Sequence, residues 1–194
     1  MSLIALLAFV RALGLTLPLW IVAGWSTAEA VLWFIVADVP ISWIAVRSGT
    51  RAGLLAALVA AGSAIVGGTI TYQWASHDAA GATATIEHLP AISSALIGQA
   101  ATQWSASGFM GMLLGSFSGT PYKLFALAAG TQGSPFPAFL IATFAARLPR
   151  YVVVALVAGT LSRLLSSRLT YRRRLVLLGV IWIIIYVQYF TVMA

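Results

Sequence analysis

Apolar residues in this chain form long runs, which are separated by short polar segments. The runs over residues 54–74 and 175–192 contain no charged residue, and each matches the roughly 20 residues that a helix needs to cross the hydrocarbon core of a bilayer. A third run, over residues 136–161, is of similar length but carries Arg147 and Arg150 inside it. The pattern predicts a membrane-spanning helix over each of these runs.

Two apolar stretches contain a proline that is followed nine residues later by a glycine. Pro121 follows Pro40 by 81 residues, and Gly130 follows Gly49 by the same number. Because proline lacks an N–H group, it interrupts a helix, and a break at membrane depth must be shielded by protein or water. The spacing therefore predicts two related halves, each interrupted within the membrane, as in transporters whose broken helices mark the substrate path.

We expect the first half at about residues 27–76 and the second at about 92–162, joined by a polar loop at about 77–91. A C-terminal transmembrane helix is expected at about 175–193. The length permits about five or six membrane-embedded segments. Residues 1–194 are therefore expected to form a single membrane domain.

The remaining apolar runs are less regular. Residues 3–25 are expected to form a membrane helix or a shallow amphipathic entry segment. The stretch 28–46 is apolar but holds Glu29 and Asp38, and a lipid-facing helix does not carry an ionised aspartate near its middle. The run over 92–117 is expected to be the descending arm of a re-entrant hairpin with its tip near Pro121.

The composition agrees with a membrane protein and excludes several kinds of chemistry. Hydrophobic residues make up 61% of the chain and charged residues 8%, which does not suit the surface of a soluble domain. Cysteine is absent, which excludes disulfides, thiolate catalysis and iron–sulfur sites. His77 and His88 share the polar loop with two acidic residues, but loop histidines are usually solvated, so neither a metal nor a cofactor is expected.

The formal net charge is +7, and five basic residues fall between Arg163 and Arg174. In a membrane protein such a cluster predicts a cytoplasmic loop, which would place the C-terminus on the opposite side. Contact with anionic lipid headgroups is the second interpretation. Nucleic acid is not expected as a partner, because the cluster has no folded platform beside it.

Two segments in the second half of the chain resemble motifs of a known family of membrane proteins. The segments Phe117-Ser-Gly-Thr-Pro-Tyr-Lys-Leu-Phe125 and Ala146-Arg-Leu-Pro-Arg-Tyr151, with Gly130 between them, resemble the DedA family, the bacterial branch of the SNARE-associated or VTT-domain membrane proteins. The resemblance covers about residues 36–159. It implies an all-α membrane protein of the bacterial inner membrane, in which two inverted pseudo-repeats each hold a re-entrant helical hairpin and a transmembrane helix. It also implies movement of lipids between leaflets, often coupled to the proton motive force.

Carried over by position, the resemblance assigns the acidic role to Asp38 and Glu29, and the arginine role to Arg147 and Arg150. The family pattern also has one arginine just before the re-entrant proline and another three residues after it. This chain has Thr120 and Leu124 at those positions, with Lys123 beside them. Because of this difference, neither the proton coupling nor the type of lipid substrate can be carried over from the family.

The residues themselves favour an anionic ligand. Lys123, Arg147 and Arg150 are cations in embedded segments, and a lipid phosphate is the natural group to gather them. Arg147 and Arg150 lie three residues apart, so they share a helix face. The alternative is that these arginines form structural ion pairs with Asp38 and Glu29. For Asp38 itself, proton coupling and a purely structural role both stay open. Pro121 and Tyr122 complete the expected substrate-binding set at the hairpin tip.

The leading hypothesis is therefore a lipid translocase or scramblase that moves a polyprenyl phosphate or phospholipid between leaflets, without covalent chemistry. The alternatives are a proton-coupled exporter of a small solute or ion and, less favoured, a membrane-assembly scaffold. An intramembrane enzyme is not expected, because the spans hold no cysteine or histidine and only Asp38 and Glu29 as candidate bases. Gly62, Gly67 and Gly68 allow close helix packing within one protomer or between two, so a homodimer stays open.

Overall fold

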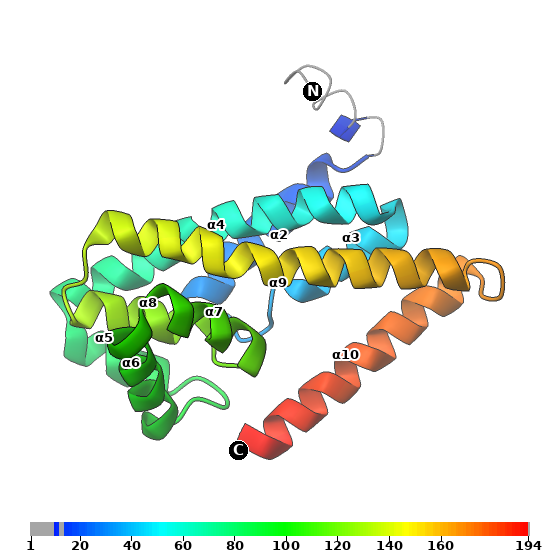
Figure 1. Ribbon diagram of the computed structural model, residues 1–194. Helices are drawn as coiled ribbons and strands as arrows, with labels where there is room; N and C mark the ends of the chain where they lie inside the picture. Colours follow the sequence, from blue (N-terminus) through cyan, green and yellow to red (C-terminus); the bar gives the residue numbers. More distant parts are fainter. Residues whose placement is uncertain (1–9, 12–13, 194) are drawn as a thin grey trace.

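The computed structural model describes residues 10–11 and 14–193, and this part of the chain consists of helices joined by short connections (Figure 1). Three helices are long and apolar enough to cross a membrane, namely α4 (Thr50–His77), α9 (Phe136–Leu165) and α10 (Tyr171–Met193). At 1.5 Å per residue, α4 measures about 42 Å, which exceeds the roughly 30 Å of a hydrocarbon core. The helices predicted over the three long runs are thus confirmed, and the described part of the chain is all-helical, which is consistent with an all-α membrane protein.

Helices α4 and α9 form the central pair and run antiparallel (Figure 1). Small residues let them approach closely, as is typical of membrane helices. Gly159, near the end of α9, lies so close to Thr50 that an added Cβ would collide with its side chain. At the other end of the pair, a Cβ on Gly68 of α4 would lie 3.3 Å from the ring of Phe139 in α9.

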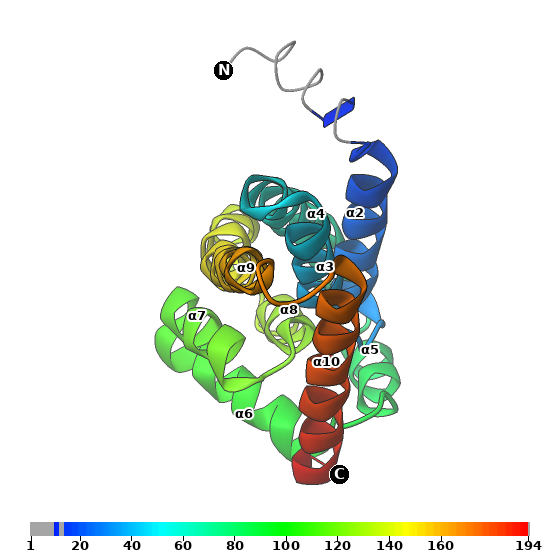
Figure 2. The same cartoon turned by 90° about the vertical axis from the view of Figure 1, so that its right-hand side faces the viewer.

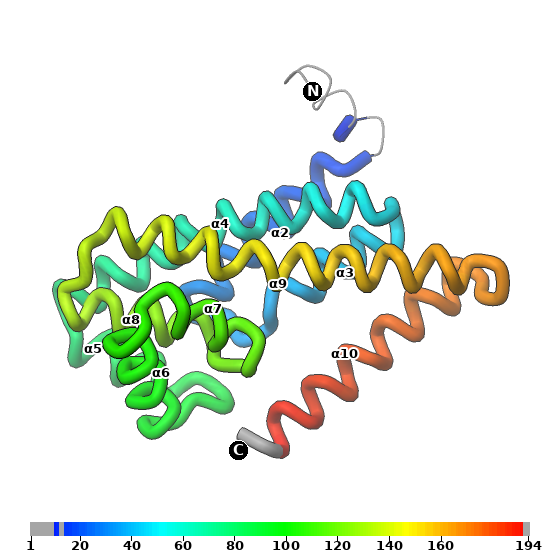
Figure 3. The backbone as a smooth tube through the Cα atoms, viewed as in Figure 1, coloured from blue at the N-terminus to red at the C-terminus, as the bar shows by residue number. Residues whose placement is uncertain are grey.

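In the first half, α2 (Thr16–Val31) lies along α4, and α3 (Asp38–Ser48) leads into it. Ser26 donates a hydrogen bond from its hydroxyl to the carbonyl of Ala60 at 2.8 Å, which ties α2 to α4. Gly49 has a φ of +88°, a conformation that glycine adopts at no steric cost, and this permits the sharp reversal from α3 into α4. Consequently α3 begins near the middle of the molecule and runs outward to the start of α4 (Figure 3).

In the second half, α6 (Ser94–Ser107) and α7 (Phe109–Ser118) lead to α8 (Tyr122–Thr131). Helix α8 is buried on all sides from Tyr122 to Gly130, as expected for a helix that is apolar around most of its circumference. A Cβ on Gly130 would lie 2.8 Å from the Cβ of Ala75, near the end of α4. Helices α3 and α8 therefore run from the middle of the molecule toward opposite ends of α4 (Figure 1).

Three segments differ from the sequence-based expectations. The polar segment 77–91 contains a helix, α5 (Ala79–Glu87), because Asp78 caps it by accepting a hydrogen bond from the Gly81 N–H at 2.9 Å. The run over 92–117 is broken into α6 and α7 at Gly108, whose φ is +48°. The expected segment 3–25 lies partly outside the described residues, and α2 continues beyond its predicted end to Val31.

Helix α10 follows α9 after a short connection and returns at an angle along the molecule (Figures 1 and 2). Its first turn is held by Arg174, which donates to the Ser162 hydroxyl at 2.7 Å. Further along, the Trp182 indole N–H donates to the Ser42 hydroxyl of α3 at 3.0 Å. Most of its apolar side chains stay exposed, which suits a helix that faces lipid.

Charges segregate along the long axis of the molecule. Seven arginines lie at the end where α3 and α9 finish and where α4 and α10 begin: Arg47, Arg51, Arg163, Arg168, Arg172, Arg173 and Arg174. The opposite end holds Asp78 and Glu87, which flank α5. The two ends of the central helix pair are therefore of opposite charge.

Candidate functional site

Two ion pairs join the halves of the chain where the short helices meet. Glu29, in the last turn of α2, accepts a 2.5 Å hydrogen bond at Oε1 from Nη2 of Arg147, near the middle of α9. Its Oε2 accepts from the backbone N–H of Ala37 at 3.0 Å and from the Tyr151 hydroxyl at 3.3 Å. Because Glu29 and Arg147 are both buried, this pair is shielded from solvent.

The second ion pair connects Arg150 with Asp38, in the first turn of α3. Arg150 donates from Nε to Asp38 Oδ2 at 2.8 Å and from Nη2 to the same oxygen. Its Nη1 donates to the carbonyl of Ser116 in α7 at 2.6 Å. Asp38 Oδ1 is buried and has no hydrogen-bond partner among the described residues, so one carboxylate oxygen retains its full capacity to accept a hydrogen bond or a proton.

Aromatic rings surround the Arg147 guanidinium. Its Cζ lies 4.7 Å from the ring centroid of Tyr151 and 5.1 Å from that of Tyr122, within the range of cation–π attraction. The Tyr122 hydroxyl lies 2.9 Å from the hydroxyl of Thr143 on α9. Arg147 is thus held by its carboxylate and by two rings at once.

Lys123 lies in the first turn of α8 and has no carboxylate partner among the described residues. Its Nζ donates to the backbone carbonyl of Trp33 at 2.7 Å, just beyond the end of α2. The residue is only 3% exposed. Its charge lies at a helix N-terminus, where the helix dipole already favours an anion, and no side chain caps that terminus.

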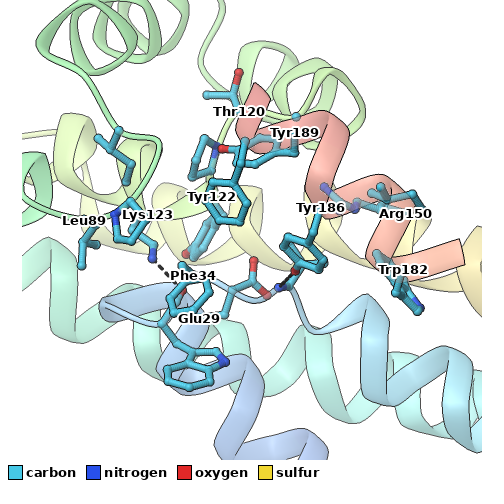
Figure 4. A pocket seen from close by; sticks show the side chains of 18 of the residues that line it. Glu29, Phe34, Leu89, Thr120, Tyr122, Lys123, Arg150, Trp182, Tyr186 and Tyr189 are labelled. Atoms are coloured by element: carbon cyan, nitrogen blue, oxygen red, sulfur yellow. Dashed lines mark hydrogen bonds between the residues drawn. The ribbon is translucent and has the colours of Figure 1, made fainter. Parts of the chain in front are cut away.

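A cavity of about 180 Å³ opens beside these groups (Figure 4). Its charged lining consists of Glu29, Lys123, Arg147 and Arg150, and Pro121 lies on its wall. At roughly 30 Å³ per water molecule, the space is large enough for a small polar headgroup. The side chain of Arg150 is 21% exposed, so this arginine is the more accessible of the two.

The far wall of the cavity comes from α10, which places Trp182, Tyr186 and Tyr189 against it (Figure 4). The Tyr186 hydroxyl accepts a 2.8 Å hydrogen bond from the backbone N–H of Val36, in the connection between α2 and α3. The site residues expected from the sequence did not include Tyr186 and Tyr189. Their spacing with Trp182, at intervals of four and three residues, was the signal that they share one helix face.

The predicted site residues are therefore brought together. Lys123, Arg147 and Arg150 line the same cavity as Pro121 and Tyr122, and each arginine pairs with one of the two predicted acidic residues. The alternative of structural ion pairs is thus the arrangement in this structure. Tyr72 of α4 lies outside this set and donates its hydroxyl to the carbonyl of Ser134.

The histidines of the 77–91 segment have local roles. Nδ1 of His77 lies 2.7 Å from the carbonyl of Gln73, and Nδ1 of His88 lies 2.6 Å from that of Ala84. Within the described part of the chain, no group of three or more histidine or acidic residues is arranged to hold a metal ion.

Together, the fold and the site define an all-α membrane protein with two buried ion pairs, a surplus buried lysine and a cavity beside them. Comparisons of the chain with family models, curated proteins and solved structures found no match.

Proposed function

We propose that this protein moves a phosphate-containing lipid, a phospholipid or a polyprenyl phosphate, between the leaflets of a membrane. The observation that carries the proposal is the cavity itself, in which Lys123 and Arg150 lie between helices long enough to span a bilayer. The phosphate crosses through this cavity while the hydrocarbon tail stays in lipid. No covalent step is involved.

In this proposal, α2–α3 and α7–α8 are two re-entrant hairpins of inverted pseudo-repeats, as the DedA resemblance implies. The antiparallel course of α4 and α9 supports this interpretation, as does the outward course of α3 and α8 toward opposite ends of α4. The two prolines that recur at an offset of 81 residues both lie near the start of a short helix, whereas of the two glycines Gly49 ends α3 and Gly130 lies inside α8. Pro40 lies in the first turn of α3, and Pro121 directly precedes α8.

The cations have different roles. Arg150 is the partly exposed guanidinium, and its planar donors suit two phosphate oxygens. Lys123 supplies a point charge from the opposite side of the cavity. Arg147 is a positioning residue, because Glu29 and two tyrosine rings already surround it.

Helix α10 is the side through which the lipid tail extends. It packs mainly on α3 and closes the cavity through hydrogen bonds from Val36 to Tyr186 and from Trp182 to Ser42. Arg174 ties the first turn of α10 to Ser162 of α9, while the rest of the helix is largely exposed, so that part can separate from α3 without disturbing the central pair. Such a separation opens the cavity laterally to lipid.

Proton coupling enters through Asp38. A proton on its unpaired Oδ1 removes the negative charge that holds Arg150 and releases the guanidinium to a phosphate. The same observation favours a second candidate function, a proton-coupled exporter of a small solute or ion. Solute flux without lipid movement would distinguish the exporter from the translocase.

The charge segregation supports an orientation. Cytoplasmic ends of membrane proteins accumulate arginine and lysine, so we place the end with the seven arginines in the cytoplasm. With the DedA resemblance, this favours the inner membrane of a bacterium. Gly67 and Gly68 pack inside the protomer, whereas Gly62 has open space around its Cα, so Gly62 is the glycine of the three that is available for a homodimer contact.

The test is reconstitution of the purified protein into liposomes, followed by measurement of leaflet-to-leaflet movement. The movement of a labelled phospholipid is followed, and retention of a water-soluble dye inside the same liposomes controls for bilayer leakiness. The proposal predicts protein-dependent movement of the phospholipid. If folded protein does not accelerate the phospholipid beyond protein-free liposomes, the proposal is wrong.

A further inference from the structure

The charges around the cavity do not balance. The two carboxylates, Glu29 and Asp38, each pair with one arginine, Arg147 and Arg150 respectively. Lys123 remains as a third cation. With all five groups ionised, the site therefore carries one surplus positive charge.

No carboxylate near Lys123 is left to offset this charge, because Glu29 is already paired with Arg147. Its nearest hydrogen-bond acceptor is the neutral carbonyl of Trp33. The other acidic residues, Asp78 and Glu87, flank α5 beyond the end of α4 and do not line the cavity. The partial positive charge at the N-terminus of α8 and the partial negative charge at the C-terminal end of α2, where Trp33 lies, act on Lys123 in opposite directions, so neither helix end supplies a whole counter-charge. An uncompensated cation inside a membrane protein is costly, and such groups usually mark a ligand or ion pathway.

We infer that the site takes a lipid phosphate with one negative charge, that is, a phosphodiester, and discriminates against phosphomonoesters. The inference rests on the proposed lipid translocation and specifies its substrate class: of the two lipids proposed above it selects the phospholipid, because a polyprenyl phosphate is a phosphomonoester. A phosphodiester has a single ionisable oxygen, so its charge equals the surplus on the protein. A phosphomonoester carries about −1.5 to −2 near pH 7, which leaves net negative charge in the occupied cavity.

The rest of the cavity wall cannot neutralise a second negative charge. The α10 side consists of aromatic and aliphatic residues, among them Trp182, Tyr189 and Phe190. The hydroxyl of Tyr186 accepts a hydrogen bond from Val36 and keeps its own O–H to donate, but a neutral hydroxyl adds no positive charge. While Asp38 is ionised, both arginines are engaged by carboxylates, so a dianion would have to displace Asp38 and leave that carboxylate unpaired in a buried position. Leaving one partner of a buried ion pair uncompensated is strongly unfavourable.

The experiment compares two lipids that differ by one methyl group. Phosphatidic acid is a monoester, and its methyl ester, phosphatidylmethanol, is a diester with identical acyl chains. Both are labelled on an acyl chain, and their leaflet-to-leaflet movement is measured in proteoliposomes at about pH 8, where the monoester is close to doubly charged. We expect phosphatidylmethanol to move at least about ten times faster than phosphatidic acid.

Variants test whether site charge sets this preference. Asp38→Asn raises the site charge by one unit and shifts the rate ratio toward phosphatidic acid. Lys123→Gln removes the surplus, retains a donor for the Trp33 carbonyl, and lowers the rate for both anionic lipids. Arg51→Gln, an exposed change outside the site, removes the same charge as Lys123→Gln and leaves the ratio unchanged. Each variant is first shown to be folded by its elution profile and helical content.

The outcomes separate the two proposals. Equal rates for the two lipids, faster phosphatidic acid, or a ratio that Asp38→Asn does not shift would overturn the phosphodiester inference and leave lipid translocation intact. Movement of neither lipid by folded wild-type protein would instead contradict the translocation proposal itself.

Discussion

Arg150 reaches across from α9 to Asp38 on α3 and donates two hydrogen bonds to one carboxylate oxygen, while the second oxygen has no partner among the described residues. Arg150 lies in the second half of the chain and Asp38 in the first, 112 residues earlier. The pair therefore links the two halves at the cavity, and it is the link that a proton can weaken.

The Glu29–Arg147 pair is expected to stabilise the fold. Breaking a buried ion pair by removing one partner costs about 3–5 kcal/mol, so Arg147→Met should lower the free energy of unfolding by that amount. Replacing both partners, in Glu29→Leu with Arg147→Met, should cost less than Arg147→Met alone, because no unpaired charge remains. Unfolding in detergent micelles, followed by helical content, checks both. A double variant less stable than the single one would contradict the explanation.

Glycine packing on α4 gives a matched pair of substitutions. A Cβ at Gly67 would collide with the backbone of Thr27 in α2, whereas Gly62 has nothing within 4 Å. Gly67→Ala should destabilise the protein by about 1–3 kcal/mol, and Gly62→Ala should be neutral or stabilise it by up to about 1 kcal/mol. Thermal unfolding of both variants measures the difference. If Gly62→Ala also dissociates a dimer, seen as a change in mass in detergent, Gly62 lies at a protomer contact.

Cross-linking tests whether α10 must separate from α3. The chain has no cysteine, so Val39→Cys with Gly179→Cys introduces a unique pair on facing walls of one apolar groove between the two helices. A short bis-maleimide that joins them should abolish lipid movement, because α10 can no longer move away. A monofunctional maleimide on the same variant controls for labelling. Full activity of the cross-linked protein would show that α10 stays in place during transport.

Proton coupling makes a separate prediction about Asp38. An imposed pH gradient should accelerate lipid movement by the wild type, because protonation of the free Oδ1 releases Arg150. In Asp38→Asn the gradient should have no effect, while movement without a gradient remains. The same liposome assay with and without a gradient measures this. A gradient effect that persists in Asp38→Asn would place the proton on another group.

Much of the fold could be predicted from the sequence, because the bilayer dictates the length and polarity of a spanning helix. The helices α4, α9 and α10 follow from that requirement alone. The break at Gly108 could not be predicted, because the same run also contains Gly98, Gly111 and Gly115, and only the fold determines which glycine adopts a positive φ. Helix α5 depends on the local cap that Asp78 provides.

The site was predictable in its residues but not in its pairing. Charged side chains inside apolar runs are conspicuous. Five of them converge on one region, namely Glu29, Asp38, Lys123, Arg147 and Arg150. The pairing of each arginine with its carboxylate depends on how the two halves of the chain pack together. That packing could not be derived from a single sequence. The position of Tyr186 in the cavity wall could not be predicted either, because it depends on the angle between α10 and the helix before it, α9.

The most direct test of the central claim is lipid movement by a variant without Lys123 and Arg150, the two cavity cations that we assign to the phosphate. Lys123→Gln with Arg150→Gln is compared with Arg51→Gln and Arg163→Gln, which removes the same charge from exposed positions. Both proteins are shown to be folded and are reconstituted at equal density. We predict that the cavity variant moves a labelled phosphatidylglycerol at least about tenfold more slowly than the surface variant. Equal rates for the two variants would contradict the assignment of the cavity as the phosphate path.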